Sequence, residues 1–507
     1  MIRHTLLTVL FLIFSAGASV FSQTITSAPA GGNWNSTATW IGGVIPGPGN
    51  DVVIASGGNN VTVTVAAGCA NLTIGSGSTR GRLYHNSGTE LTVNGTVTMT
   101  QGTGFENRWR INAGSATVAG LISFPGSSTN TSNTAAITIT SGVLNANGGI
   151  SFTSSAAITK IIDMSGGTGT LNLKGALTTP ATSSTLTTLT TGSIFNYTDV
   201  NPQTIFFFSS GTYENLYINN TSASGATISA AITAANVTGN IVVGNINTGS
   251  FFSTGNFNIG MTSSKTLTVS ANSTMDAGTS IISFPATPGS ATINGTFKTA
   301  NTNGFSGATT TAINSNNNPA ITLGTTSTIE FNAAGTQKVT NRTYAGNVVL
   351  TGATKTIGTA VSQTVTIGKN FTINGGATYE GSTYDPVLSV GGNFSNSGIF
   401  VQGVSLVSFN GATIQNIMGS TATTFSNGVT LSNPAGLSIT TSPTILGTLT
   451  FASGKITTGT NKVILGVSAT AIGAGAGKYV FGNLEMYIPN TVAPSVNFFV
   501  GDAANYT

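Results

Sequence analysis

The stretch Leu91–Val97 (LTVNGTV) decides the fold, because it carries a motif that recurs along the chain. The motif is an apolar residue, any residue, an apolar residue, any residue, glycine, any residue and an apolar residue. It returns at Ala116–Ile122, Leu171–Leu177, Ala291–Phe297 and Leu388–Phe394. The alternation places apolar side chains on one face of a short strand, and the glycine permits a tight turn. Such a short unit cannot bury its own apolar face, so its repetition predicts stacked turns that form a common core.

The composition favours strands over helices throughout the chain. Only 6% of the 507 residues are charged, whereas 66 are glycine and 39% are hydrophobic. Short alternating runs such as Leu267–Val269 (LTV) and Ala136–Thr140 (AITIT) stop at glycine, asparagine or serine. We therefore predict an all-β fold, an elongated parallel β-helix or β-solenoid. We expect about 20 coils between Val61 and Gly466, spaced by about 4.8 Å.

A longer repeat places a glutamine six residues after an aromatic residue. The pairs are Tyr197 with Gln203, Phe331 with Gln337, and Phe409 with Gln415. Each is followed by a second aromatic residue and an asparagine: Tyr213 with Asn215, Tyr344 with Asn347, and Phe425 with Asn427. The glutamines either line a binding face or bond the backbone inside the solenoid while the aromatic ring fills a corner. We favour the internal role.

Residues 1–22 have the pattern of a secretory signal peptide. Arg3 precedes the apolar core Leu6–Phe14, and small residues follow. We expect cleavage after Ser22, with Ala18 as the other candidate. The apolar core is too short to span a bilayer, which takes about 20 residues. The mature protein is therefore expected to be extracellular or on the cell surface, without a membrane span.

The remaining chain divides into three predicted regions. Residues 23–60 form an N-terminal cap and opening strand, residues 61–466 the solenoid, and residues 467–507 the start of a following β-rich region. The first coil of a solenoid must be covered, and Trp34 and Trp40 supply bulk for this purpose. Stacking on carbohydrate is the alternative role for these two tryptophans. Cys69, the single cysteine, excludes an internal disulfide framework and is expected to pack in the core.

Two stretches carry a resemblance to a known family. Gly31–Val65, with Trp34, Trp40, Pro46 and Asp51, resembles the opening segment of large secreted β-helical surface proteins of the Bacteroidota. Gly447–Gly466, together with the short motifs that follow it up to Tyr506, is similar to the closing motif of the same proteins. The resemblance implies export as type IX secretion cargo. A C-terminal sorting domain usually follows in that family, so we expect a chain truncated at Thr507.

The residues with catalytic potential are few and scattered. The closest two of the twelve acidic residues are Glu380 and Asp385, five positions apart, and His85 is the single histidine after the signal peptide. Polysaccharide cleavage requires paired carboxylates, and zinc sites require clustered ligands. We therefore expect no enzyme activity, no metal and no cofactor. The net charge of +4, spread over the whole chain, also argues against nucleic-acid binding.

One local concentration of charge and aromatic side chains is a candidate ligand face. Its members are Arg80, Arg82, Tyr84, Arg108, Trp109 and Arg110. If the chain returns one coil later, these residues share a face. Trp109 would then stack on an acidic or sugar ligand while the arginines clamp it. The alternative, which we favour, is an exposed face with Arg–Glu pairs, each contributing about 0–1 kcal/mol.

Together these observations predict an exported structural or adhesion scaffold without catalytic activity. The alternative function is a carbohydrate-binding or polysaccharide-degrading β-helix protein. The expected partners are surface glycans or other cell-surface proteins.

Overall fold

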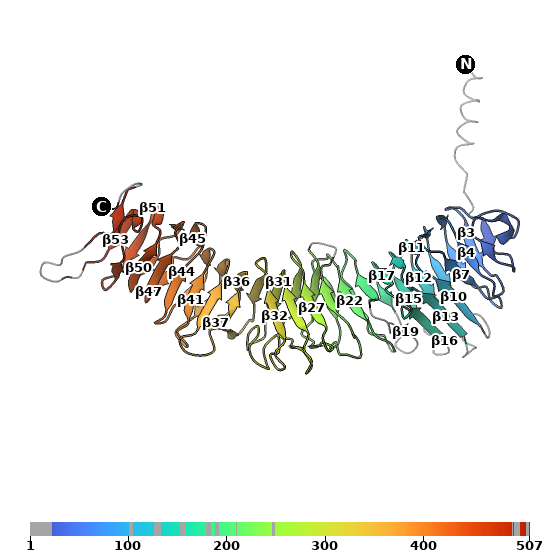
Figure 1. Ribbon diagram of the computed structural model, residues 1–507, viewed down its shortest axis with the longest axis horizontal. Helices are drawn as coiled ribbons and strands as arrows, with labels where there is room; N and C mark the ends of the chain where they lie inside the picture. The colour runs from blue at the N-terminus through green and yellow to red at the C-terminus, as the bar shows by residue number, and fades with distance from the viewer. Residues whose placement is uncertain are drawn as a thin grey trace, which may run out of the picture. The chain divides into compact units, whose positions relative to one another are not determined.

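A computed structural model describes residues 23–100, 105–125, 133–152, 158–178, 184–187, 192–208, 210–245, 249–488, 490, 497–502 and 506. These residues form parallel sheets that make a β-solenoid of about 19 turns, which confirms the predicted all-β fold class. Successive strands of a sheet lie side by side as rungs (Figure 1). The predicted signal peptide, residues 1–22, lies outside the described residues. No helix in the described part of the chain is long and apolar enough to cross a membrane.

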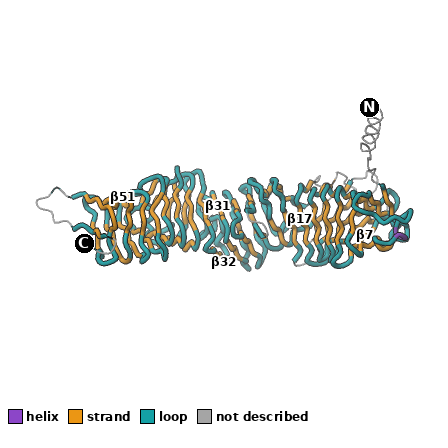
Figure 2. Tube along the Cα trace, turned by 90° about the horizontal axis from the view of Figure 1, so that it is seen from above, coloured by secondary structure: helices purple, strands orange, loops and turns teal. Residues whose placement is uncertain are grey.

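The chain divides into two compact units. Unit 1 comprises Met1–Ser193 with Phe208–Gly211, and unit 2 comprises Ile194–Phe207 with Thr212–Thr507. Strands and turns alternate along both (Figure 2).

Unit 1 is three-sided, because each turn contributes one strand to each of three parallel sheets. The first sheet contains β1 (Thr24–Thr26), β3 (Asp51–Ile54), β6 (Leu72–Ile74), β9 (Val97–Met99), β12 (Ile122–Phe124), β15 (Ile150–Phe152) and β18 (Leu177–Thr178). The second contains β2 (Gly32–Asn33), β4 (Val61–Val63), β7 (Arg82–His85), β10 (Glu106–Arg110), β13 (Asn133–Thr138), β16 (Ile158–Asp163) and β19 (Ser184–Thr187). The third contains β5 (Ala67–Cys69), β8 (Glu90–Val93), β11 (Ser115–Val118), β14 (Val143–Ala146) and β17 (Thr170–Leu173).

Unit 2 is built on the same plan, with parallel strands stacked turn on turn. One sheet contains β20 (Ile194–Tyr197), β22 (Asn215–Ile218), β24 (Ile241–Val243), β27 (Thr266–Val269), β30 (Ser290–Ile293) and β32 (Ala320–Leu323). The largest contains β21 (Gln203–Ile205), β23 (Ala226–Ile228), β25 (Phe251–Ser253), β28 (Thr274–Asp276), β31 (Thr296–Thr299), β33 (Thr328–Phe331), β36 (Asn347–Leu350), β39 (Phe371–Ile373), β42 (Phe394–Asn396), β45 (Gln415–Met418), β48 (Leu437–Ile439), β51 (Ile456–Leu465), β49 (Thr444–Ile445), β46 (Thr424–Phe425), β53 (Val480–Met486) and β54 (Val500–Gly501).

Three smaller sheets complete unit 2. Two strands, β26 (Ile259–Gly260) and β29 (Ile282–Ser283), form the first. The second contains β34 (Gln337–Val339), β37 (Thr354–Ile357), β40 (Thr378–Glu380) and β43 (Ile399–Val401). The third contains β35 (Thr343–Tyr344), β38 (Thr364–Ile367), β41 (Val387–Val390), β44 (Leu406–Phe409), β47 (Gly428–Ser432), β50 (Thr448–Ser453) and β52 (Thr470–Ile472).

The core consists of columns of inward side chains held in register by the parallel pairing. In unit 1 one column runs through Leu83, Trp109 and Ile137, all fully buried. In unit 2 a column of Phe371 and Phe394 has ring centroids 5.6 Å apart. Each rung thus removes its neighbour's apolar surface from water, at about 25 cal/mol per Å². Burial by stacking is the physical basis of the fold.

The glycine of the recurring motif is required by close approach of neighbouring turns. A Cβ atom at Gly120 would lie only 2.7 Å from the carbonyl oxygen of Gly95, which occupies the same motif position in another copy. Non-bonded contacts that short are not tolerated in a packed interior. Glycine therefore recurs because successive backbones meet at this corner.

Strand pairing already begins inside the predicted cap, residues 23–60. Strand β1 pairs in parallel with β3, and β2 pairs with β4. Trp34 and Trp40 are buried beside the short 3₁₀ turn η1 (Thr37–Thr39), with ring centroids 5.0 Å apart. The Trp40 Nε1–H donates to the Trp34 carbonyl oxygen over 2.7 Å. Two rings that are 1% and 3% exposed support the first turn and leave no face for carbohydrate stacking.

Pairing also continues beyond Gly466. Strand β52 pairs in parallel with β50, and β53 pairs with β51. The residues predicted to start a following β-rich region therefore extend the same parallel stack. At the other end of the chain, Cys69 is fully buried. Burial, assisted by the charge of Asp51, raises the pKa of its thiol to about 12, so Cys69 is a packing residue as predicted.

The internal role predicted for the repeated glutamines is confirmed. Gln337 and Gln415 are at most 1% exposed. The side-chain oxygen of each accepts the backbone N–H of the residue four positions earlier, Ala333 at 3.1 Å and Gly411 at 2.8 Å. The Gln415 Nε2 group donates to the Val390 and Gly392 carbonyl oxygens of the preceding turn. The glutamines thus satisfy backbone groups at the ends of strands.

Candidate ligand-binding surface

The arginine-rich segment predicted from the sequence lies on β7 and β10, neighbouring strands of the second sheet. Arg82 is the register partner of Arg108, and Tyr84 is the partner of Arg110. The side chains alternate, so these four residues point outward while Leu83 and Trp109 point inward. The expectation that the chain returns one coil later and brings the arginines onto one face is therefore met by the register.

Trp109 does not belong to that face, and its predicted stacking on a ligand is wrong. Its side chain is fully buried, and its Nε1–H donates to His85 Nε2 over 3.0 Å. The alternation itself carried the signal, since Arg108 and Arg110 flank the tryptophan and must point the opposite way. Burial lowers the pKa of His85 to about 4, so the imidazole is neutral at pH 7 and accepts this hydrogen bond.

The outward residues of β7 and β10, with Arg80 just before β7, form what we call the arginine face: Arg80, Arg82, Tyr84, Glu106, Arg108 and Arg110. Arg108 forms an ion pair with Glu106. The Arg110 guanidinium lies 5.3 Å from the centroid of the Tyr84 ring, and that of Arg80 lies 5.3 Å from the Phe105 ring. Such cation–π contacts hold the guanidinium planes over the rings.

The favoured alternative, a face with Arg–Glu pairs, holds for only one of the four arginines. Within the described residues, Arg80, Arg82 and Arg110 have no carboxylate within ion-pair distance. The Nε atoms of Arg80 and Arg110 are buried without a hydrogen-bond partner. The face therefore keeps positive charge that no described carboxylate neutralises.

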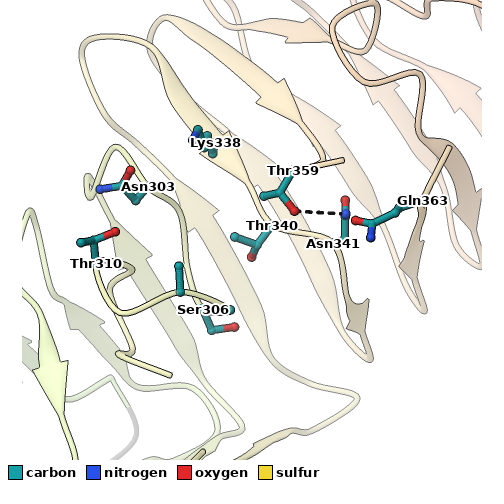
Figure 3. A pocket seen from close by; sticks show the side chains of 10 residues that line it. Asn303, Ser306, Thr310, Lys338, Thr340, Asn341, Thr359 and Gln363 are labelled. Carbon is teal, nitrogen blue, oxygen red and sulfur yellow. Dashed lines mark hydrogen bonds between the residues drawn. The ribbon is translucent and has the colours of Figure 1, made fainter. Parts of the chain in front are cut away.

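A second candidate surface, a hollow of about 410 Å³ in unit 2, was not foreseen from the sequence. Seven of its ten lining residues carry an amide or hydroxyl side chain and one, Lys338, is charged: Asn303, Ser306, Gly307, Ala308, Thr310, Lys338, Thr340, Asn341, Thr359 and Gln363. Figure 3 shows Asn303, Ser306 and Thr310 on one side of the hollow and Thr359 and Gln363 on the other. The signal in the sequence is the long polar segment between β31 and β32, far longer than the usual turn.

The geometry of this polar hollow leaves one acceptor unused. Asn341 Nδ2 donates to Thr359 Oγ1 over 3.3 Å, and the Asn341 Oδ1 atom is buried without a partner. Thr340 Oγ1 shares a hydrogen bond of 3.2 Å with the Tyr344 hydroxyl. Amide and hydroxyl groups around a concave surface suit a ligand rich in hydroxyl groups.

Within the described residues, no group of three or more histidine, cysteine, aspartate or glutamate side chains could hold a metal ion. Compared with protein-family models, curated proteins and solved structures, the chain shows no significant match. The function must therefore be argued from the surfaces themselves.

Proposed function

We propose that the protein is an exported scaffold of the cell surface or extracellular space that adheres through repeated outward side chains and performs no catalysis. The observation that carries this proposal is a ladder of asparagines in unit 2. Asn370 N–H donates to Asn347 Oδ1 over 3.1 Å, Asn393 N–H to Asn370 Oδ1 over 2.9 Å, and Asn416 N–H to Asn393 Oδ1 over 2.9 Å. Four successive turns thereby carry an asparagine at the same place.

Repetition of this kind suits adhesion through many weak contacts. A ligand that binds one rung meets an identical rung about 4.8 Å further on, so weak contacts add up. Only 6% of the residues are charged, so non-specific binding of charged polymers to such a surface is weak. The signal-peptide pattern and the resemblance to secreted β-helical proteins of the Bacteroidota support the proposed location.

The test uses the chain from residue 23 onward, coupled to beads. We expect the beads to adhere to polysaccharide-coated surfaces and to bacterial cells. The same protein, incubated with a panel of polysaccharides, should release no reducing ends and no unsaturated uronides. Product formation proportional to protein concentration would overturn the non-catalytic proposal. Protease treatment of intact cells should remove the protein, and complete protection would contradict a surface location.

A second candidate function, binding of neutral carbohydrate without cleavage, is favoured by the polar hollow of unit 2. Asn303, Gln363 and the unpartnered Asn341 Oδ1 offer donors and acceptors that match sugar hydroxyls. A glycan array probed with the wild-type chain and with the Asn303→Ala/Gln363→Ala variant tests it. Loss of a signal in that variant, but not in Thr430→Ala on β47, supports the hollow as the site. Equal signals in all three proteins would exclude it.

A further inference from the structure

The chain carries few charges, and the arginine face is where its positive charges are most concentrated in the sequence. Four guanidinium groups and one carboxylate lie on the outward side of two successive rungs and the residue that precedes them. Arg82 and Arg108 are register partners on parallel strands about 4.8 Å apart. Like charges at directly opposed positions of a sheet destabilise it. A fold that keeps them needs a counter-charge.

The neighbouring strands do not supply one. On the side of β13, Arg108 faces Ala136 and Arg110 faces Thr138. On the side of β4, Tyr84 faces Thr62. The nearest acidic residue in this column, Asp163, is one strand beyond Thr138, and its Oδ1 atom accepts hydrogen bonds from Ser165. Glu106 neutralises one charge, so the positive charges of three arginines remain uncompensated.

The guanidinium groups are also presented in a way that suits an oxyanion. The guanidinium groups of Arg110 and Arg80 each lie 5.3 Å from the centroid of an aromatic ring, a contact that restrains their position. Guanidinium N–H groups match carboxylate and sulfate oxygens in bidentate geometry. The hollows of about 410 and 430 Å³ are lined by other residues. The outward face of a sheet suits an extended polymer better than a small enclosed anion.

The aromatic side chains argue against a nucleic acid as the polymer. Single-stranded nucleic acids bind where bases stack on free aromatic rings. Here Trp109 is fully buried, and the Tyr84 and Phe105 rings carry guanidinium groups. The face therefore offers charge and planar donors without a platform for bases.

We propose that the arginine face binds an acidic polysaccharide, with carboxylate or sulfate groups of successive sugars bridging arginines of adjacent rungs. Arg82, Arg108 and Arg110 make the contacts, and Arg80 extends the site by one position. The proposal names a partner for the scaffold and therefore rests on the proposed function. Its partner supplies counter-charge for the three arginines that Glu106 does not neutralise.

The experiment measures binding of the chain from residue 23 onward to immobilised heparin, as a sulfated probe, and to polygalacturonate, as a carboxylated probe. Neutral dextran and a DNA duplex serve as comparison ligands. We expect binding to at least one acidic probe, weakened by added salt. The Arg82→Ala/Arg110→Ala variant should bind at least 10-fold more weakly, because it loses charge-assisted hydrogen bonds.

Two further variants separate the site from bulk charge. Lys174→Ala/Lys369→Ala removes the same charge elsewhere on the surface and should change affinity less than 2-fold, because specific charge-assisted contacts outweigh distant screened charges. Arg82→Lys/Arg110→Lys keeps the charge but not the bidentate geometry, and should bind with intermediate affinity. Far-ultraviolet circular dichroism and denaturation midpoints confirm that each variant is folded.

Three outcomes would overturn the inference: no binding to either acidic probe, equal weakening in the lysine control, or tighter binding to DNA than to both polysaccharides. If the arginine face binds no acidic polysaccharide, beads coated with the Arg82→Ala/Arg110→Ala variant should still adhere. The scaffold proposal would then stand although the inference about the arginine face had failed. Polysaccharide cleavage by the wild-type chain would instead refute the scaffold proposal while heparin binding persisted.

Discussion

Units 1 and 2 use the same parallel stacking but place different side chains in register on their outer surfaces. In unit 1, Arg82 is paired with Arg108. In unit 2, Asn370 and Asn393 belong to a ladder in which each side chain accepts the backbone N–H of the next turn. An asparagine side chain offers its Oδ1 atom as an acceptor to the backbone N–H of the next turn, whereas guanidinium groups only donate and repel each other. In-register stacking therefore gives unit 2 a regular ladder of polar side chains and unit 1 a cluster of like charges.

The buried polar groups differ in a parallel manner. Unit 1 contains a neutral His85 that pairs with Trp109. Unit 2 contains Gln337 and Gln415, and also Lys355, whose Nζ donates to the Ala333 and Ala353 carbonyl oxygens over 2.9 and 3.2 Å. Burial lowers the pKa of Lys355 to about 8. Unit 1 bonds its own backbone as well, since the buried Asn107 accepts the Gly81 N–H and donates to the Thr100 carbonyl oxygen. The feature particular to unit 1 is the buried pair of His85 and Trp109.

The largest effect is expected from Trp109→Ala in unit 1. The substitution leaves a cavity in the column formed with Leu83 and Ile137 and deprives His85 of its donor, which should cost about 3–5 kcal/mol. Hydrogen exchange should show the loss of protection in β7, β10 and β13, with unit 2 unchanged. Trp109→Phe, as a control, should cost less. Full stability of Trp109→Ala would mean that the ring is not part of the core.

Acid should destabilise unit 1 through His85. Because the folded-state pKa of about 4 lies below the ordinary 6.5, the unfolded chain binds an extra proton between these values. Stability should fall by about 3 kcal/mol as the pH drops from 6.5 to 4. Denaturant titrations of the wild type and His85→Gln at pH 7 and pH 4 measure this difference. Parallel pH profiles for the two proteins would refute a buried neutral histidine.

Gln415→Ala should destabilise unit 2 by about 2 kcal/mol, since buried partners lose their hydrogen bonds. The Gly411 N–H and the Gly392 carbonyl oxygen lose the partner that Gln415 supplies, and the Val390 carbonyl oxygen keeps only the Asn410 N–H. Gln363→Ala, at an exposed position, serves as the control and should change the free energy of unfolding by less than about 0.5 kcal/mol. Equal effects in the two variants would contradict an internal role for Gln415.

The smallest effect, about 1 kcal/mol, is expected from Asn393→Ala in the ladder. The variant removes the acceptor of the Asn416 N–H but leaves the bond from Asn370 N–H to Asn347 Oδ1. Hydrogen exchange at Asn416 should therefore accelerate while Asn370 remains protected. If exchange at Asn416 is unchanged, the ladder adds nothing to backbone pairing. The proposed difference between the asparagine ladder of unit 2 and the paired arginines of unit 1 would then be wrong.

Much of the fold was predictable because its determinants are local. The alternation around Gly95 indicates the turns and the inward positions of the strands. The repeated spacing of an aromatic residue and a glutamine indicates the internal glutamines. The arginine face was predictable in large part, since five of its six predicted members lie on it: Arg80, Arg82, Tyr84, Arg108 and Arg110. Trp109 was misplaced because its hydrophobic surface was weighed as a ligand contact, although its place between two outward arginines assigned it to the core. The polar hollow was missed because its lining comes from three separate segments.

The amino-acid sequence alone was enough to establish an all-β chain whose short strands stack in parallel, because alternation and glycine punctuation act within a few residues. Only the tertiary structure decided which residues of different turns face each other. That register depends on the length of every intervening loop, and a shift of one residue would turn each outward side chain inward. The pairing of Arg82 with Arg108, the asparagine ladder and the polar hollow all follow from that register.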